Sequence, residues 1–390
     1  MDRSPRNLQG EQIECRTIFR EKHKPLCFQC AGVSPQQMMH ILRQDAEVWD
    51  LFTRKEEYGN RSRDQYGRFP YYRSRHRDIS VPRASQMLTE KGYRCQFPEA
   101  QPFAICLTHD IDTVYEPLVS KGLKAVQALK NRDLSRAAGI IPELCSKKRS
   151  WWNFEEIASL EESYGAHSSF FFLALEDGAR EYNYAVEDLE QEMCMLHDRG
   201  WEIGLHGGCE AYRDPAALAG EKRRLEKVLN RKVVGFRNHY LKFSVPETWE
   251  LLEEAGFLYD TTLGYPDCIG FRNGMCHPFR PCNLLTNQEM RILEIPLVIM
   301  DQTLLSYMRL DPKQAWDQIE HLLNIVEQYH GVISILWHNN SMSGDLLRIY
   351  EKILKHCQER SAWMTSCREI ASWWKKIGMR TPSVALTPAQ

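Results

Sequence analysis

The chain has 390 residues, of which 43% are hydrophobic and 26% are charged, and its formal net charge is -2. This balance is ordinary for a soluble folded protein with one large domain or two medium domains. It gives no overall positive charge to attract nucleic acid, and the apolar stretches are far shorter than the ~20 residues of a membrane helix, so we expect neither a nucleic-acid partner nor a transmembrane segment.

Residues 1–100 are predicted to form an N-terminal extension of unknown role. The opening MDRSPRNLQGEQIECR has no apolar secretory core, and the 13 cysteines follow no repeated spacing, so we expect a cytoplasmic protein with reduced thiols. Cys27 and Cys30 have the spacing of half a zinc site or of a redox pair, but no second such pair exists, which favours buried thiols or a loop. Residues 54–83 interleave arginine and tyrosine with acidic residues, which favours packing over a neighbouring domain rather than nucleic-acid binding.

From residue 101 onward, short apolar runs alternate with amphipathic stretches. The apolar runs predict strands at 103–108, 168–174, 201–205, 232–237, 291–299 and 331–337. The amphipathic stretches predict helices at 117–131, 153–164, 184–199, 214–230, 246–255, 312–329, 344–358 and 366–376. Continuous apolar strands separated by helices are typical of a parallel sheet covered by helices, either doubly wound or closed as a barrel. We assign residues 101–377 to this domain and residues 378–390 to a C-terminal tail.

Four of the predicted strands end in clusters of polar side chains. In parallel α/β sheets the chemistry lies at the carboxyl ends of the strands. A single His or Asp at such a position more often caps a strand than catalyses a reaction, but four clusters at four strand ends predict one site. The clusters are Thr108-His109-Asp110-Ile111-Asp112, His206-Gly207-Gly208-Cys209-Glu210, Arg237-Asn238-His239-Tyr240 and Trp337-His338-Asn339-Asn340.

Three residues of these clusters predict a metal site. Asp112, His206 and Glu210 offer O, N and O donors for one divalent ion, with zinc favoured and cobalt, nickel, manganese or iron as alternatives. His206 and Glu210 are four residues apart, so they share a face if the segment turns helically. Three protein ligands leave a position for water and a substrate carbonyl, as a catalytic metal site requires.

The remaining ionisable residues suit acid–base chemistry around that ion. Asp110 is free to act as the general base, and His338 can protonate a leaving amine. Arg237 can orient the base carboxylate and keep it ionised through charge-assisted hydrogen bonds. Together these residues predict a metal-assisted hydrolase of an amide or an ester.

The clusters resemble the motifs of the polysaccharide deacetylase superfamily (NodB-like, carbohydrate esterase family four). Its motifs TFDDG, H-[ST]-x-x-H, R-x-P-[FY] and L-x-H correspond to THDID, HGGCE, RNHY and LWH, and the resemblance covers roughly residues 101–377. THDID, RNHYL and FRNGMCHPFR resemble a THDVD-type branch of it. The resemblance implies a distorted (β/α) barrel, Asp110 as base, Asp112 as ligand, and His338 as acid. It also implies that Arg237 braces the base and that the Tyr240 backbone N–H stabilises an oxyanion.

Several positions depart from the family pattern. Ile111 separates two acids that are usually adjacent, although residues i and i+2 of a strand share a face. Glu210 replaces the second histidine of its motif, which adds negative charge to the predicted metal site. His239 replaces a proline, and a loop or core position is the expected place for it.

The fourth family motif, an Asp that tunes the catalytic histidine, has no clean match. Asp260 is the first candidate for this catalytic role and Asp267 the second, while Asp260 can also simply cap a strand end. His277, in a long loop, can line a wall of the substrate site.

These expectations give a leading function and several alternatives. The leading prediction is a cytoplasmic deacetylase of N- or O-acetylated sugars or sugar conjugates. The alternatives are hydrolysis of another non-peptide amide, including ring amides, on the same fold, or a catalytically silent carbohydrate-binding relative. A nucleic-acid binder built on residues 54–83 ranks third.

Overall fold

The computed structural model describes residues 35–116 and 151–380. The pair Cys27 and Cys30, the predicted helix 117–131 and residues 381–390 of the predicted tail lie outside the described residues. The described residues all belong to one compact unit. No helix in the described ranges is both long and apolar enough to cross a membrane.

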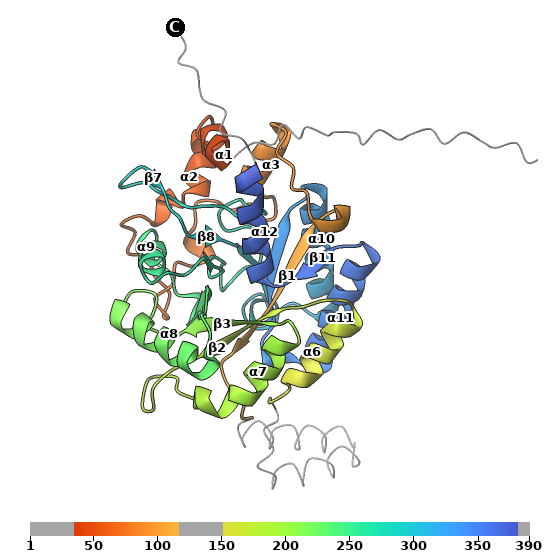
Figure 1. The fold of residues 1–390 in the computed structure, drawn as a ribbon. Coiled ribbons are helices and arrows are strands. Elements are labelled where there is room, and N and C mark those ends of the chain that lie inside the picture. The colour runs from red at the N-terminus through yellow and green to blue at the C-terminus, as the bar shows by residue number, and fades with distance from the viewer. Residues whose placement is uncertain (1–34, 117–150, 381–390) are drawn as a thin grey trace, which may run out of the picture. The chain divides into compact units, whose positions relative to one another are not determined.

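The centre of the fold is a parallel sheet surrounded by helices (Figure 1). Its order is β8-β5-β4-β3-β2-β1-β10-β9, with β11 also paired to β1. The strands are β1 (Ala104–Ile111), β2 (Ser169–Leu173), β3 (Glu202–Gly207), β4 (Gly235–Asn238), β5 (Tyr259–Asp260), β8 (Leu293–Glu294), β9 (Leu297–Met300), β10 (Val332–Leu336) and β11 (Trp363–Thr365). A small antiparallel hairpin is formed by β6 (Cys282–Asn283) and β7 (Gln288–Glu289).

The two ends of the sheet are one stretch of chain. β8 pairs with β5 and β9 pairs with β10, and only Ile295 and Pro296 separate β8 from β9. The sheet therefore curls on itself and is closed covalently through this stretch. Because proline has no N–H to give to a ladder, it suits the point where the chain changes pairing partners. The predicted distorted (β/α) barrel is confirmed.

Amphipathic helices cover the outside of the barrel (Figure 1). They are α6 (Phe154–Ser163), α7 (Glu190–Asp198), α8 (Pro215–Leu229), α9 (Glu247–Glu254), α10 (Pro312–Gln328), α11 (Gly344–Glu359) and α12 (Cys367–Arg380). α10 starts at a capping box in which Asp311 and Gln314 satisfy each other's backbone N–H groups, and proline occupies its first turn. Its buried face repeats at helical spacing, with Ala315, Ile319, Leu322 and Val326 in the core.

Residues 35–100 share the hydrophobic core of the barrel. α1 (Pro35–Leu42), α2 (Ala46–Phe52) and α3 (Arg83–Glu90) lie near α12 (Figure 1). Met38 and Leu88 are buried in the same cluster as Trp373, and Phe97 stacks on Trp373 at 4.8 Å between ring centroids. Arg54, from the Arg/Tyr-rich stretch, is fully buried and forms ion pairs with glutamates of the same stretch. Arg68 is buried as well, whereas Arg61, Arg63, Arg73, Arg75 and Arg77 are exposed, so only some arginines of this stretch pack against the barrel.

Successive side chains of β1 point to opposite faces of the sheet, and this determines which of them reach the site. All eight residues of β1 are buried. Thr108 and Asp110 both bond to Arg237 of β4, inside the barrel. His109 lies on the opposite face, where its ring bonds to Glu161 of α6 at 2.8 Å. A strand with period two thus sends one set of polar groups inward and the other toward the helical layer.

Candidate active site

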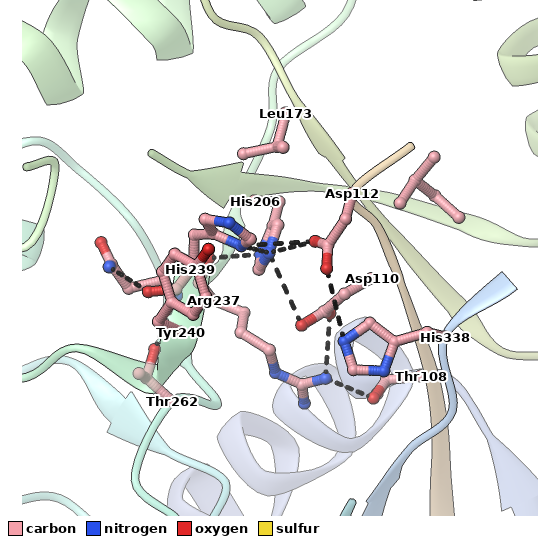
Figure 2. A network of polar contacts seen from close by, with 12 residues as sticks. Thr108, Asp110, Asp112, Leu173, His206, Arg237, His239, Tyr240, Thr262 and His338 are labelled. Atoms are coloured by element: carbon pink, nitrogen blue, oxygen red, sulfur yellow. Dashed lines mark hydrogen bonds and ion pairs between the residues drawn. The ribbon is translucent and has the colours of Figure 1, made fainter. Parts of the chain in front are cut away.

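Side chains from four strands meet at the carboxyl end of the barrel (Figure 2). β1 carries Asp110 and, one residue past its end, Asp112. His206 lies near the end of β3 and Arg237 on β4, and His338 follows β10 by two residues. Neighbouring parallel strands end at the same edge of a sheet, which is why residues so distant in sequence converge.

Asp112, His206 and His239 form a group with the composition of a metal site. Asp112 Oδ1 lies 3.1 Å from His206 Nε2 and 3.3 Å from His239 Nδ1. The two imidazole nitrogens are 3.1 Å apart. Within the described residues, Asp112 Oδ1 is buried and has no hydrogen bond of acceptable geometry. His206 Nε2 and His239 Nδ1 also lie within hydrogen-bond distance of each other, and three convergent donor atoms of this kind fit a shared cation once the protons between them are lost.

The spacing of these three atoms fits first-row divalent ions. Ligand bonds of about 2.0–2.1 Å place neighbouring ligand atoms about 3.3–3.4 Å apart around a tetrahedral ion and about 2.9 Å apart around an octahedral one. The observed separations of 3.1, 3.1 and 3.3 Å fall between these limits. The group therefore needs little movement to hold such an ion.

The hydrogen bond made by Nδ1 of His206 leaves Nε2 as the nitrogen that can bind a metal ion. Its Nδ1 donates to the carbonyl oxygen of Arg237 at 3.1 Å, so the lone pair of Nε2 faces Asp112. Burial would raise the pKa of Asp112, but His239 and His206 hold it well below its usual range. Burial would lower the pKa of His206, but the charges of Asp110 and Asp112 raise it, so an ion bound here would displace a proton from the imidazole, whose neutral form is the metal ligand.

The structure does not bring Glu210 to this group. Its carboxylate is 45% exposed and pairs with Arg213 at 2.5 Å. The expectation assumed a helical turn after His206, but β3 continues to Gly207 and the chain then makes irregular turns. The third candidate ligand is His239, which follows β4 directly. His239 belongs to one of the four polar clusters predicted at strand ends, although a loop or core position was the expected place for it.

Asp110 and Arg237 form a buried pair beside the group. Arg237 Nη1 donates to Asp110 Oδ1 at 3.2 Å and to Thr108 Oγ1 at 2.5 Å. Its Nε donates to the carbonyl oxygen of Thr261 at 3.0 Å, and the side chain is fully buried. The guanidinium is therefore fixed between β1 and Thr261, which directly follows β5. His206 Nε2 lies 3.7 Å from Asp110 Oδ2, so the predicted base lies next to the candidate ligands.

His338 faces the group from the opposite side and is oriented by Asp301. Its Nδ1 donates to Asp301 Oδ1 at 2.7 Å, and its backbone N–H donates to Asp301 Oδ2 at 2.9 Å. Its Nε2 lies 3.6 Å from Asp112 Oδ2. Burial alone would lower the pKa of His338, but the negative charge of Asp301, with smaller contributions from Asp112 and Asp110, raises it to about 10.

The carboxylate that orients His338 is thus neither of the two predicted ones. Asp260 is fully buried on β5 and hydrogen-bonds to Thr262 and to the carboxyl of Glu294. Asp267 accepts the backbone N–H of Tyr71 at 2.9 Å. Asp301 directly follows β9, so the rule of polar strand ends would have found it. His277 bonds to Ser85 and to the carbonyl oxygen of Tyr329, so it has a structural position in the core.

Tyr240 adopts an unusual backbone conformation next to the group. Its φ is +58°, and that of Leu241 is +54°, so two successive non-glycine residues are left-handed. The Tyr240 ring lies 4.1 Å from the His239 ring between centroids. Such conformations cost about 1–3 kcal/mol each and persist where the surroundings impose them, often at functional sites.

Comparison with solved structures finds similarity to proteins of very low sequence identity. A structure described as a polysaccharide deacetylase from Mycobacterium smegmatis is 18% identical, has a TM-score of 0.52, and covers 76% of this chain and 98% of its own. A CE4 family pseudoenzyme from Bacillus anthracis is 12% identical, covers 69% of this chain and 65% of its own, and has a TM-score of 0.38. The peptidoglycan deacetylase PdaC from Bacillus subtilis is also 12% identical, covers 71% and 93%, and has a TM-score of 0.34.

These comparisons classify the protein by its fold and not by its activity. No protein-family model and no curated protein matches the chain. The fold is that of the polysaccharide deacetylases, and the first structure above supports this assignment over most of its own length. Any activity has to be argued from the residues of this chain, because a fold hosts many functions.

Proposed function

We propose that the protein is a metal-dependent hydrolase that removes acetyl groups from N- or O-acetylated sugars or sugar conjugates. The observation that carries the proposal is the convergence of Asp112, His206 and His239 between a buried carboxylate, Asp110, and an oriented imidazole, His338. A candidate ion site with a base on one side and an acid on the other suits hydrolysis of an acyl bond.

In this proposal Asp112, His206 and His239 hold one divalent ion, and His239 replaces Glu210 in the expected ligand set. Two imidazole nitrogens and one carboxylate oxygen favour zinc, and the same donors accept cobalt, nickel, manganese or iron. Such an ion supplies Lewis acidity toward a carbonyl oxygen and makes water near it more acidic.

The other residues of the site move and hold protons. Asp110 accepts a proton from the attacking water, and the hydrogen bond from Arg237 holds this carboxylate in place. His338, protonated and oriented by Asp301, gives its Nε2 proton to the leaving amine or alcohol. The backbone N–H of Tyr240, as the family resemblance implies, donates to the carbonyl oxygen as negative charge develops there.

The substrate class follows from the motif resemblance and is supported by the shared fold. Acetylated carbohydrates are the leading class, and assignment to the THDVD-type branch belongs to the same proposal. A catalytically silent carbohydrate binder is less well supported, because His239 supplies the donor that the Glu210 position does not. The base, its arginine and the acid are also in place around the group.

The experiment combines metal analysis with acetate release. The purified protein should hold close to one divalent ion, and His239→Ala should lose it. Glu210→Ala, which changes an exposed carboxylate next to the site, is the matched control and should retain it. Asp110→Asn should keep the ion and release no acetate from acetylated amino-sugar oligomers. A wild-type protein that neither binds divalent ions nor releases acetate when they are added would refute the proposal.

A further inference from the structure

A short turn of the N-terminal region, residues 64–68 with the sequence DQYGR, is built to hold one guanidinium in place. Asp64 Oδ1 accepts the backbone N–H groups of Tyr66 and Arg68, both at 2.9 Å. Asp64 Oδ2 pairs with the Arg68 guanidinium at 2.7 Å. Gly67 has a φ of +83°, which a residue with a side chain rarely adopts. The turn therefore fixes Arg68 through its own bonds.

Arg68 reaches from this turn to the candidate active site. Its side chain is only 4% exposed. Nη1 donates to the carbonyl oxygen of Tyr240 at 3.2 Å, across 172 residues of sequence, and Nη2 donates to the Tyr307 hydroxyl at 3.1 Å. A buried guanidinium with a carboxylate, a carbonyl and a hydroxyl as partners is a fixed structural group rather than a mobile surface charge.

Stacked rings connect the same turn to the candidate ligand His239. The Arg68 guanidinium lies over the ring of Tyr66 at 4.7 Å from its centroid. The Tyr66 ring stacks on the Tyr240 ring at 5.2 Å with an interplanar angle of 19°. The Tyr240 ring in turn lies 4.1 Å from the His239 ring. Arg68, Tyr66, Tyr240 and His239 thus form one continuous column, which we call the Arg68 column.

Exposed tyrosines beside such a site could also offer a platform on which a sugar ring stacks. That role needs a free aromatic face. The Tyr66 ring is already in contact with the Arg68 guanidinium and stacked on the Tyr240 ring. These contacts make the Tyr66 ring a packed structural element that supports part of the site.

The strained part of the site lies where the Arg68 column ends. Tyr240 and Leu241, both left-handed, immediately follow His239. Arg68 bonds to the carbonyl oxygen of Tyr240, which is the peptide link between these two residues. Without this bond the turn can relax toward ordinary φ values, and the residue before it would move with it. Movement of about 1 Å is enough to remove one ligand from a shared ion.

We propose that Arg68 is a positioning residue of the metal site: it holds the Tyr240–Leu241 turn in its left-handed conformation and thereby keeps His239 Nδ1 at the third ligand position. The inference rests on the proposed function only in that Asp112, His206 and His239 bind a divalent ion. It makes a turn of the N-terminal region a component of the active site of the barrel.

The test is binding of Co²⁺ to the full chain, measured by competition with a chromophoric chelator and by the visible spectrum of bound cobalt. Arg68→Ala should weaken Co²⁺ binding about 10- to 100-fold, the usual effect of losing an outer support of a ligand. Its cobalt spectrum should change in the same direction as that of His239→Ala. Arg68→Lys, which can still donate to the Tyr240 carbonyl, should recover part of the affinity. The matched control is Arg63→Ala, because Arg63 is exposed and its guanidinium donates to the nearby backbone carbonyls of Asn60 and Ser62.

The double variant separates positioning from a general loss of structure. If Arg68 acts through His239, then Arg68→Ala combined with His239→Ala should bind Co²⁺ no more weakly than His239→Ala alone. Tyr66→Leu interrupts the same column and should reproduce a weaker form of the defect, which keeps the test decisive if Arg68→Ala does not fold. Unchanged affinity and spectrum in folded Arg68→Ala, or additive losses in the double variant, would overturn the inference. Failure of the wild type to bind Co²⁺ would instead refute the metal site itself.

Discussion

Replacing Asp301 by asparagine is a sharp test of the role proposed for His338. Asp301 is fully buried, and its two oxygens accept the Nδ1–H and the backbone N–H of His338 at 2.7 and 2.9 Å. Asparagine keeps the shape but has one oxygen and one NH₂ group. It therefore turns a donor toward one of these two N–H groups and removes the negative charge.

The magnitude follows from the pKa of His338. The acidic neighbours raise this pKa from an ordinary 6.5 to about 10. A bound divalent ion offsets the charges of Asp110 and Asp112, which leaves Asp301 as the main source of the increase. Without it the pKa falls to ~6.5 or below, because burial also lowers it, so that at most ~3% of His338 is protonated at pH 8 and at most about three quarters at pH 6. We therefore expect acetate release to fall at least ~30-fold at pH 8 and by a much smaller factor at pH 6 from this cause.

The assay is a pH–rate profile of the metal-loaded protein with an acetylated amino-sugar oligomer. An NMR titration of the His338 ring gives an independent reading of its pKa. Asp301→Asn should keep its bound ion, because Asp301 is not one of the candidate ligands. Equal losses at pH 6 and pH 8, or an unchanged pKa of His338, would refute the reasoning.

Two further predictions concern buried groups outside the active site. Burial lowers the pKa of His277 to about 4, so its uncharged form stabilises the native state above pH ~6.5. This contribution, up to about 3 kcal/mol, should be lost as the pH falls from ~6.5 to ~4, and urea unfolding of His277→Gln should show a flatter pH dependence over this range. For Asp260 and Glu294, burial raises both pKa values, so the pair costs stability as the pH rises above ~4.5. Between pH 5 and pH 8 the Asp260→Asn variant should lose less thermal stability than the wild type. Its pH–rate profile should match that of the wild type. A shifted profile would instead indicate a catalytic role for Asp260.

The strands and most of the site could be predicted because both depend on local patterns. Each long strand is a continuous apolar run, and the polar residue at its end marks the edge where strands meet. This rule placed Asp110, Asp112, His206, Arg237 and His338 at one end of the barrel, where the structure has them. The short strand β5, with two residues, gives no such run, and β11 was missed as well.

The errors in the site come from geometry that the local pattern does not contain. Glu210 suits a metal site by chemistry and by spacing, but only if the chain turns helically after His206. His239 and Asp301 lie directly after strands and could have been weighed by the same rule. The contact between Arg68 and Tyr240 spans 172 residues and depends on the tertiary fold alone, so nothing in the local sequence indicates it.

The central claim is that one divalent ion is held by Asp112, His206 and His239. The most direct measurement is the crystal structure of the zinc-loaded protein, with anomalous diffraction recorded on both sides of the zinc absorption edge. The account predicts one anomalous peak at the carboxyl end of the barrel, about 2.0–2.1 Å from Asp112, His206 Nε2 and His239 Nδ1. A peak whose ligands include Glu210 in place of His239, or no peak at this site with stoichiometric zinc present, would contradict it.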